Sequence, residues 1–202
     1  MTNKYVNRAK LDERKFRELT RFFTLDLTAI QIAELTNLNR NTVNRYLTEM
    51  RKKILIHCIS TSPFQQVPKF HDTKSFPYQL LLLTEQNERI YTDLLQASDT
   101  FTNIETCLKN CSVPSHVDAV VLLKNHDFAT LHPPLHRSKV ENGKINRIKS
   151  FWGRSKSRLS KFKGMHSSTL ILHIKECEFR YNNREKELYE VLLKIFRNDP
   201  LF

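Results

Sequence analysis

Residues 28–48 read TAIQIAELTNLNRNTVNRYLT, and this stretch decides how the first quarter of the chain folds. Apolar residues recur at helical spacing on both sides of the polar triplet 37–39, so we expect two helices joined by a tight turn. The hydroxyl group of Thr28 can cap the first of these helices. Asn37 suits the turn because asparagine tolerates a left-handed backbone conformation.

A third helix is expected over residues 11–23, where apolar residues again follow one helical face. Together with helices at 28–36 and 40–53 it predicts a three-helix helix-turn-helix bundle in residues 1–60. Arg side chains can bond guanine edges, Asn side chains can bond adenine, and both can hold phosphate. The residues expected to face a DNA groove from the helix at 40–53 are Arg40, Asn41, Asn44 and Arg45. The same pattern also fits a plain three-helix bundle with a basic surface.

The charge of the chain is strongly positive and unevenly placed. The 202 residues carry a net charge of +12, which favours a polyanion such as nucleic acid as partner. Residues 1–53 hold 12 Lys and Arg against 6 Asp and Glu, whereas residues 84–130 hold 3 against 7. Residues 144–163 hold 8 basic residues and no acidic one. The order is a basic head, an acidic middle and a basic stripe.

The remainder of the chain mixes strands with helices. The proline-containing segment 61–78 is expected to be a linker, and residues 79–202 a second domain. Short apolar runs at 79–84, 89–95 and 117–123 predict strands, and helices are expected at 99–111 and in the last third of the chain. This alternation predicts an α/β or α+β fold with a small sheet and C-terminal helices. With its own apolar face, the head is expected to fold when expressed alone.

Two further stretches contain specific sequence motifs. Residues 142–164 read NGKINRIKSFWGRSKSRLSKFKG, and residues 172–183 read LHIKECEFRYNN. Both resemble motifs of small bacterial insertion-sequence transposases, whose equivalents read roughly INGIESFW, then RLxKFxG, then LHLKECEWRFN. The head is also similar to the DNA-binding unit of that group. The resemblance implies a helix-turn-helix followed by an RNase H-like domain, here internally shortened, that cuts DNA with two metal ions, normally magnesium, held by three acidic residues.

The acidic residues that the resemblance implies are not all present. Lys149 stands where the group has its third catalytic acid, and an ammonium group cannot bind magnesium. The second acid should follow the strand at 117–123, where Asp127 is the nearest carboxylate. Asp72 is a faint match to the first acid. We therefore expect a transposase, or remnant of one, that binds element ends and is catalytically inactive, with magnesium doubtful.

The basic stripe is interpreted as a phosphate-binding surface. With no acidic residue inside it, the stripe cannot form the salt bridges between residues four apart that a merely solvated helix uses. A solvated helix face is the alternative interpretation. The stripe consists of Lys144, Arg147, Lys149, Arg154, Lys156, Arg158, Lys161 and Lys163.

Other functions remain open from the sequence. A helix-turn-helix transcriptional regulator without catalysis would share the head, and a metal-dependent nuclease with relocated ligands would share the charge. Cys107 and Cys111 lie one helical turn apart, but no second Cys or His pair stands at zinc-ligand spacing. We expect a cytoplasmic protein that binds double-stranded DNA and no membrane, with the oligomeric state, including a homo-oligomer, left open.

Overall fold

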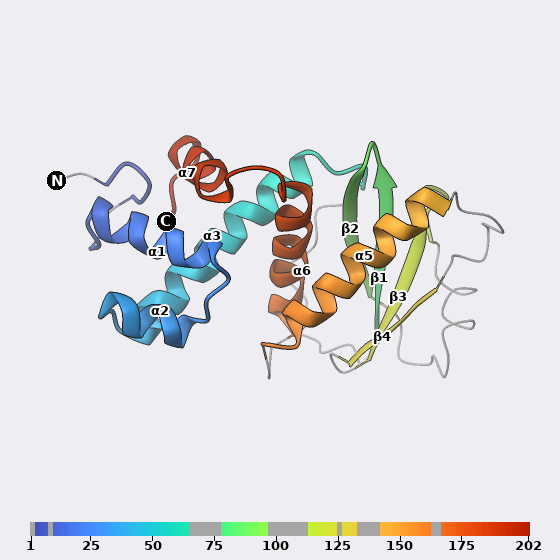
Figure 1. Ribbon diagram of the computed structural model, residues 1–202, viewed down its shortest axis with the longest axis horizontal. Helices are drawn as coiled ribbons and strands as arrows, with labels where there is room; N and C mark the ends of the chain where they lie inside the picture. Colours follow the sequence, from blue (N-terminus) through green and yellow to red (C-terminus); the bar gives the residue numbers. More distant parts are fainter. Residues whose placement is uncertain are drawn as a thin grey trace. The chain divides into compact units, whose positions relative to one another are not determined.

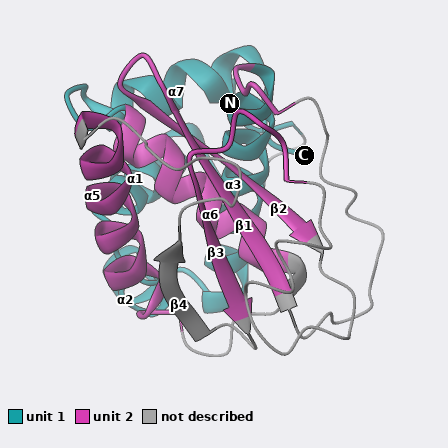
Figure 2. Ribbon diagram, turned by 90° about the vertical axis from the view of Figure 1, so that its right-hand side faces the viewer, with its two compact units in different colours: residues 1–60, 183–202 teal, residues 61–182 magenta. Residues whose placement is uncertain are grey.

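The computed structural model describes residues 3–7, 10–64, 78–96, 113–124, 127–132, 142–162 and 167–202. Helices and an antiparallel sheet occur together in these residues, so the expected mixed α/β class is confirmed. The chain divides into two compact units, coloured separately in Figure 2. Unit 1 comprises residues 1–60 and 183–202, and unit 2 comprises residues 61–182.

Three helices form the first part of unit 1: α1 (Glu13–Thr24), α2 (Ala29–Thr36) and α3 (Arg40–Ser60). Thr28 caps α2, with its side chain bonded to the backbone of Gln31 and the side chain of Gln31 bonded back to Thr28. Asn37 has φ 55° and ψ 33°, the left-handed conformation expected for the turn. α3 is longer than expected because Ile54 and Cys58 continue its buried face beyond residue 53.

A fourth helix, α7 (Leu188–Asn198), belongs to unit 1 although it lies at the other end of the sequence (Figure 1). The ring of Phe196 lies 6.0 Å from that of Phe16 in α1, and both side chains are fully buried. The backbone of Leu201 bonds to Tyr5 and Asn7 on either side, each at 2.9 Å. Residues 183–202, placed in the second domain by the sequence analysis, thus complete the core of the first unit.

Unit 2 contains a four-stranded sheet with the strand order β2-β1-β3-β4, antiparallel throughout. The strands are β1 (Tyr78–Gln86), β2 (Arg89–Gln96), β3 (Ala119–Lys124) and β4 (Asp127–His132). Asn87 and Glu88 both have positive φ and form the two-residue turn between β1 and β2. The three expected strands are confirmed, β4 was not predicted, and the helix expected at 99–111 lies outside the described residues.

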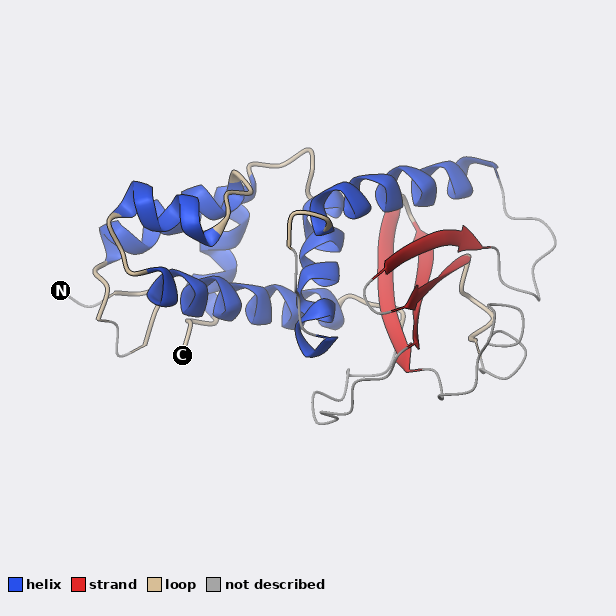
Figure 3. Cartoon of the chain, turned by 90° about the horizontal axis from the view of Figure 1, so that it is seen from below, coloured by secondary structure: helices blue, strands red, loops and turns tan. Residues whose placement is uncertain are grey.

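Two helices, α5 (Asn142–Leu159) and α6 (Ser167–Asn182), pack against one face of this sheet (Figure 3). Side chains alternate between the two faces of a strand, so Leu81 and Leu83 meet Phe151 and Ile174 of these helices. Leu80 and Leu82 point the other way, into a second apolar cluster. Because all four leucines are buried, β1 reads as a continuous apolar run rather than an alternating one.

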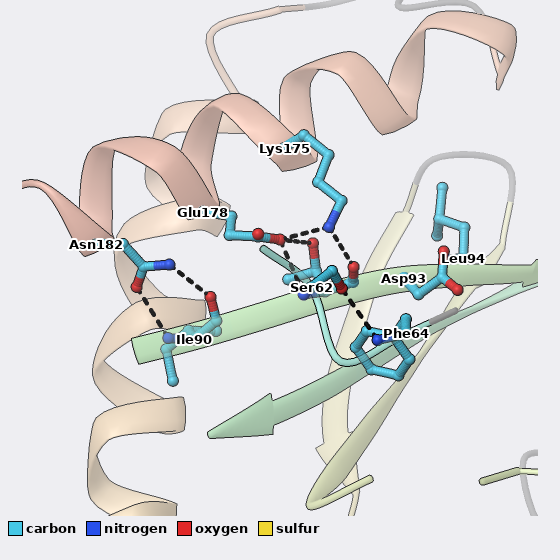
Figure 4. A network of polar contacts seen from close by, with 9 residues as sticks. Ser62, Phe64, Ile90, Asp93, Leu94, Lys175, Glu178 and Asn182 are labelled. Atoms are coloured by element: carbon cyan, nitrogen blue, oxygen red, sulfur yellow. Dashed lines mark hydrogen bonds and ion pairs between the residues drawn. The ribbon is translucent and has the colours of Figure 1, made fainter. Parts of the chain in front are cut away.

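Polar side chains of α6 cover the open edge of β2, an outer strand of the described sheet (Figure 4). Glu178 accepts hydrogen bonds from the backbone N–H and hydroxyl of Thr92 at 2.9 and 2.6 Å. The Lys175 ammonium donates to the Thr92 carbonyl and to Glu178. The Asn182 amide bonds both the N–H and the carbonyl of Ile90. These side chains therefore supply the bonds that a further strand would otherwise make.

Candidate nucleic-acid interface

The first turns of α3 present an exposed polar face. Val43 and Leu47 are buried on the opposite side of the helix, which fixes this face outward. The side chain of Asn39 accepts a hydrogen bond from the Asn41 backbone at 2.8 Å and caps the start of α3. The four predicted groove-facing residues are all exposed and share this face: Arg40, Asn41, Asn44 and Arg45.

One of these residues has an unexpected neighbour. The guanidinium carbon of Arg45 lies 4.3 Å from the centre of the Phe202 ring. The same ring meets Tyr46 edge-on, with ring centres 5.4 Å apart. No spacing pattern in the sequence links position 202 to α3, so sequence reasoning missed this residue. A cation on an aromatic face is attracted by the ring and loses part of its rotational freedom.

α5 carries the predicted basic stripe, and its side chains divide into two groups. The apolar face of the helix, including Ile148 and Phe151, is buried against the sheet. Lys149, Arg154 and Lys156 are exposed on the outer face. The exposed residues between these cations are small: Ser150, Gly153 and Ser157. A chain of phosphates could therefore approach α5 closely, with cations on both sides and no acidic side chain on the helix.

Arg147 and Arg158 form the second group, because acids from other elements hold them. Arg147 lies 3.3 Å from the buried carboxylate of Glu85 in β1. Arg158 lies 2.6 Å from Glu176 in α6, which is fully buried and also bonds Arg180. As the sequence indicates, the stripe has no acidic residue within its own helix. The fold nevertheless brings acidic partners to it from β1 and α6. Both arginines therefore form ion pairs within unit 2, which makes them less available to bind phosphate.

The remaining stripe residues lie near the two ends of α5 or outside the described residues. Lys144 is half-buried near the start of α5, and Lys161 is exposed just after its end. Lys163 lies outside the described residues. The exposed cations of α5 itself are thus the part of the stripe that is most accessible to a phosphate.

The positions that the resemblance assigns to catalytic acids do not form a described site. Asp72 lies outside the described residues. Asp127 begins β4 and pairs with Lys124 through the backbone, while its side chain is not described. Lys149, at the third position, is exposed on α5. Within the described ranges, which leave out Asp72 and the Asp127 side chain, no three His, Cys, Asp or Glu side chains converge to hold a metal ion.

Other buried carboxylates of unit 2 have structural partners. Asp118 accepts hydrogen bonds from the Glu85 backbone at 2.8 Å and from the hydroxyl of Thr84 at 3.1 Å. Burial raises the pKa of the Asp93 carboxyl, although the Leu94 N–H and the nearby charge of Lys175 act in the opposite direction. Asp118 and Asp93 therefore bond backbone groups at the end and at the edge of the sheet.

The cysteines show no sign of metal binding in the part of the chain that is described. Cys58 and Cys177 are buried free thiols. Burial raises the pKa of the Cys177 thiol, which the adjacent Arg158 only partly offsets. Cys107 and Cys111 lie outside the described residues. None of the described helices is long and apolar enough to cross a membrane.

Part of the chain is similar to a known protein. The chain is 42% identical over 50 residues to an "uncharacterized transposase-like protein" of Haemophilus influenzae. The match covers 25% of this chain and 41% of that relative. No family model matches the chain, and no solved structure matches it. Along 25% of its length, the chain is therefore similar to a transposase-like protein.

Proposed function

We propose that this chain is a DNA-binding protein derived from an insertion-sequence transposase. In this proposal α2, the turn at Asn37 and α3 form a helix-turn-helix, and α3 enters the major groove of the element ends. The observation that carries it is the exposed set of two Arg and two Asn side chains on the first turns of α3. Arg and Asn are the residues best suited to bond guanine and adenine edges.

The exposed cations of α5 give the proposed second contact. Lys149, Arg154 and Lys156 would bind phosphates without reading sequence, which adds affinity but no selectivity. The partial similarity to a transposase-like protein supports a transposase-related origin. Unit 2 would then be a shortened RNase H-like domain kept as a scaffold for α5.

The test of DNA recognition uses the full chain. Selection from a randomised duplex pool should enrich a preferred sequence, and the Kd for that duplex should then be compared with that for a scrambled one. We expect Arg45→Ala and Asn44→Ala each to weaken binding to the selected duplex by about 1–3 kcal/mol and to change binding to the scrambled duplex much less. Lys52→Ala is the matched control, because Lys52 is an exposed cation further along α3 that pairs with Glu49. Absence of any enriched sequence would refute base recognition.

We further propose that the chain does not cut DNA. Two-metal hydrolysis needs several carboxylates converging on cations about 4 Å apart, and a lysine occupies the position of the third acid. Purified protein with magnesium or manganese should neither nick nor join the selected duplex, and Lys149→Glu alone should not restore cleavage. Metal-dependent cleavage abolished by Asp72→Asn or Asp127→Asn would instead favour a nuclease with relocated ligands.

A further inference from the structure

The segment after α7 brings an aromatic ring to the proposed recognition helix. Backbone hydrogen bonds hold Leu201 between Tyr5 and Asn7, and the Asn7 amide donates to the Phe202 carbonyl at 2.9 Å. Phe196 anchors α7 in the core of the same unit. Phe202 is therefore fixed from the backbone side and is not a loose residue.

The ring of Phe202 lies between two residues of α3. One edge contact is with the buried Tyr46, at an interplanar angle of 86°. The ring face carries the Arg45 guanidinium at 4.3 Å. Phe202 nevertheless stays 41% exposed, so the ring contributes little to the buried core. Its main described contact beyond Tyr46 is this arginine.

A guanidinium stacked on a ring keeps its N–H groups at its edge. These N–H groups form the fork that can bond the O6 and N7 atoms of guanine. Arg45 is exposed, so this edge is open to solvent. An unrestrained arginine must lose the freedom of a long side chain when it binds a base, and the ring removes part of this cost in advance.

We propose that Phe202 is a positioning residue for DNA recognition, which holds the Arg45 guanidinium ready to bond a base in the major groove. This inference rests on the proposed function, because it requires that Arg45 reads DNA. It assigns a role in sequence selectivity to a residue from the opposite end of the chain. Phe202 itself need not touch DNA.

The test uses three substitutions in the full chain. Phe202→Leu keeps an apolar contact with Tyr46 but removes the aromatic face, Phe202→Tyr keeps the face, and Phe202→Ala removes both. Thermal unfolding shows whether each variant is folded. The probes are the duplex selected by the unmodified chain and its scrambled counterpart.

We expect Phe202→Leu to weaken binding to the selected duplex about two- to fivefold, the range of an exposed cation–π contact. Binding to the scrambled duplex should not change, and Phe202→Tyr should bind like the unmodified chain. In an Arg45→Ala background, Phe202→Leu should have no further effect.

Four outcomes would overturn the inference, and one of them also removes the proposed function. If the unmodified chain selects no sequence, base recognition and the role of Phe202 fail together. If it selects one that depends on Arg45 while Phe202→Leu and Phe202→Ala bind it normally, only the role of Phe202 fails. An equal loss on both duplexes, or an undiminished effect in the Arg45→Ala background, would identify Phe202 as merely structural.

Discussion

Lys175 and Glu178 form a buried ion pair that also completes the hydrogen bonding of an outer strand. Their side chains are 2% and 1% exposed, and the ammonium and carboxylate lie 2.7 Å apart. A buried charge without its partner is costly, whereas a pair with further hydrogen bonds offsets most of its own desolvation. Both residues lie in the stretch 172–183, so these two positions of the second motif serve the structure.

Removing one member of this pair should therefore destabilise the protein strongly. We expect Glu178→Ala to lower the free energy of unfolding by about 3–5 kcal/mol, because the buried Lys175 ammonium would lose the carboxylate that pairs with it. The measurement is urea unfolding followed by circular dichroism. The double variant Lys175→Met with Glu178→Gln is the control, and it should be more stable than Glu178→Ala. A double variant as unstable as the single one would show that the loss comes from packing and not from charge.

Asp93 should make stability depend on pH. Its folded-state pKa is raised by burial, whereas the unfolded value is about 3.9. The folded state then binds more protons in this window, so stability falls as the pH rises from about 4 through the raised pKa. We expect Asp93→Asn to be more stable than the unmodified protein at pH 7, with the difference shrinking towards pH 4. Thermal unfolding at several pH values checks this, with the exposed Glu34→Gln as control.

Among the elements, α5 combines a packing role with a proposed binding role. Its arginines at 147 and 158 tie it to β1 and α6, while its outer cations remain exposed. The two groups can be distinguished experimentally. Loss of an outer cation should change the salt dependence of DNA binding, whereas loss of Arg158 should change the stability of the protein.

Outer cations should control the salt dependence of DNA binding. Each of Lys149→Ala, Arg154→Ala and Lys156→Ala should reduce the slope of log K against log salt by about one, as expected for one lost phosphate contact. Arg158→Ala should leave this slope unchanged and lower stability by about 1.5–3 kcal/mol, because the buried Glu176 would lose one charged partner but keep Arg180. Anisotropy titrations at several salt concentrations give the slope. Equal slopes for all four variants and the unmodified chain would exclude α5 as a phosphate contact.

Most helices and three strands could be predicted from the sequence because their signals are local. The cap at Thr28 and the turn at Asn37 depend only on nearby residues, and the structure confirms both. β4 was missed, because residues 127–132 offer a short mixed segment whose pairing with β3 is set by the sheet. The acids that hold Arg147 and Arg158 were also missed, since Glu85 and Glu176 are far from them in sequence.

Unit 1 draws its core from two stretches that are far apart in the sequence, residues 1–60 and 183–202. Phe16 meets Phe196, and Lys53 pairs with Asp199. This arrangement changes the expectation that residues 1–60 fold alone, because that fragment lacks α7. The domain boundaries expected from composition could not reveal it, as α7 has an ordinary amphipathic pattern that fits either unit.

The contribution of α7 can be tested in the full chain. We expect Phe196→Ala to destabilise unit 1 by about 3–5 kcal/mol, since it leaves a large cavity beside Phe16. Amide hydrogen exchange should show faster exchange in α1 and α3, with less change in β1 and α6. Lys194→Ala, an exposed position on α7, is the control. Unchanged protection of α1 in the Phe196→Ala variant would contradict a shared core.

The pairing of both ends of the sequence also sets an order for biosynthesis. During translation α1, α2 and α3 emerge from the ribosome before unit 2. Their partner α7 emerges only after all of unit 2 has been translated. Domains generally fold as units during synthesis, so unit 2 can complete its sheet while the nascent head still exposes the apolar surface that Phe196 will cover. The head must close through contacts of very long sequence separation, which fold slowly. A premature stop after residue 182 would therefore release a chain whose first sixty residues stay incomplete and open to chaperones and proteases.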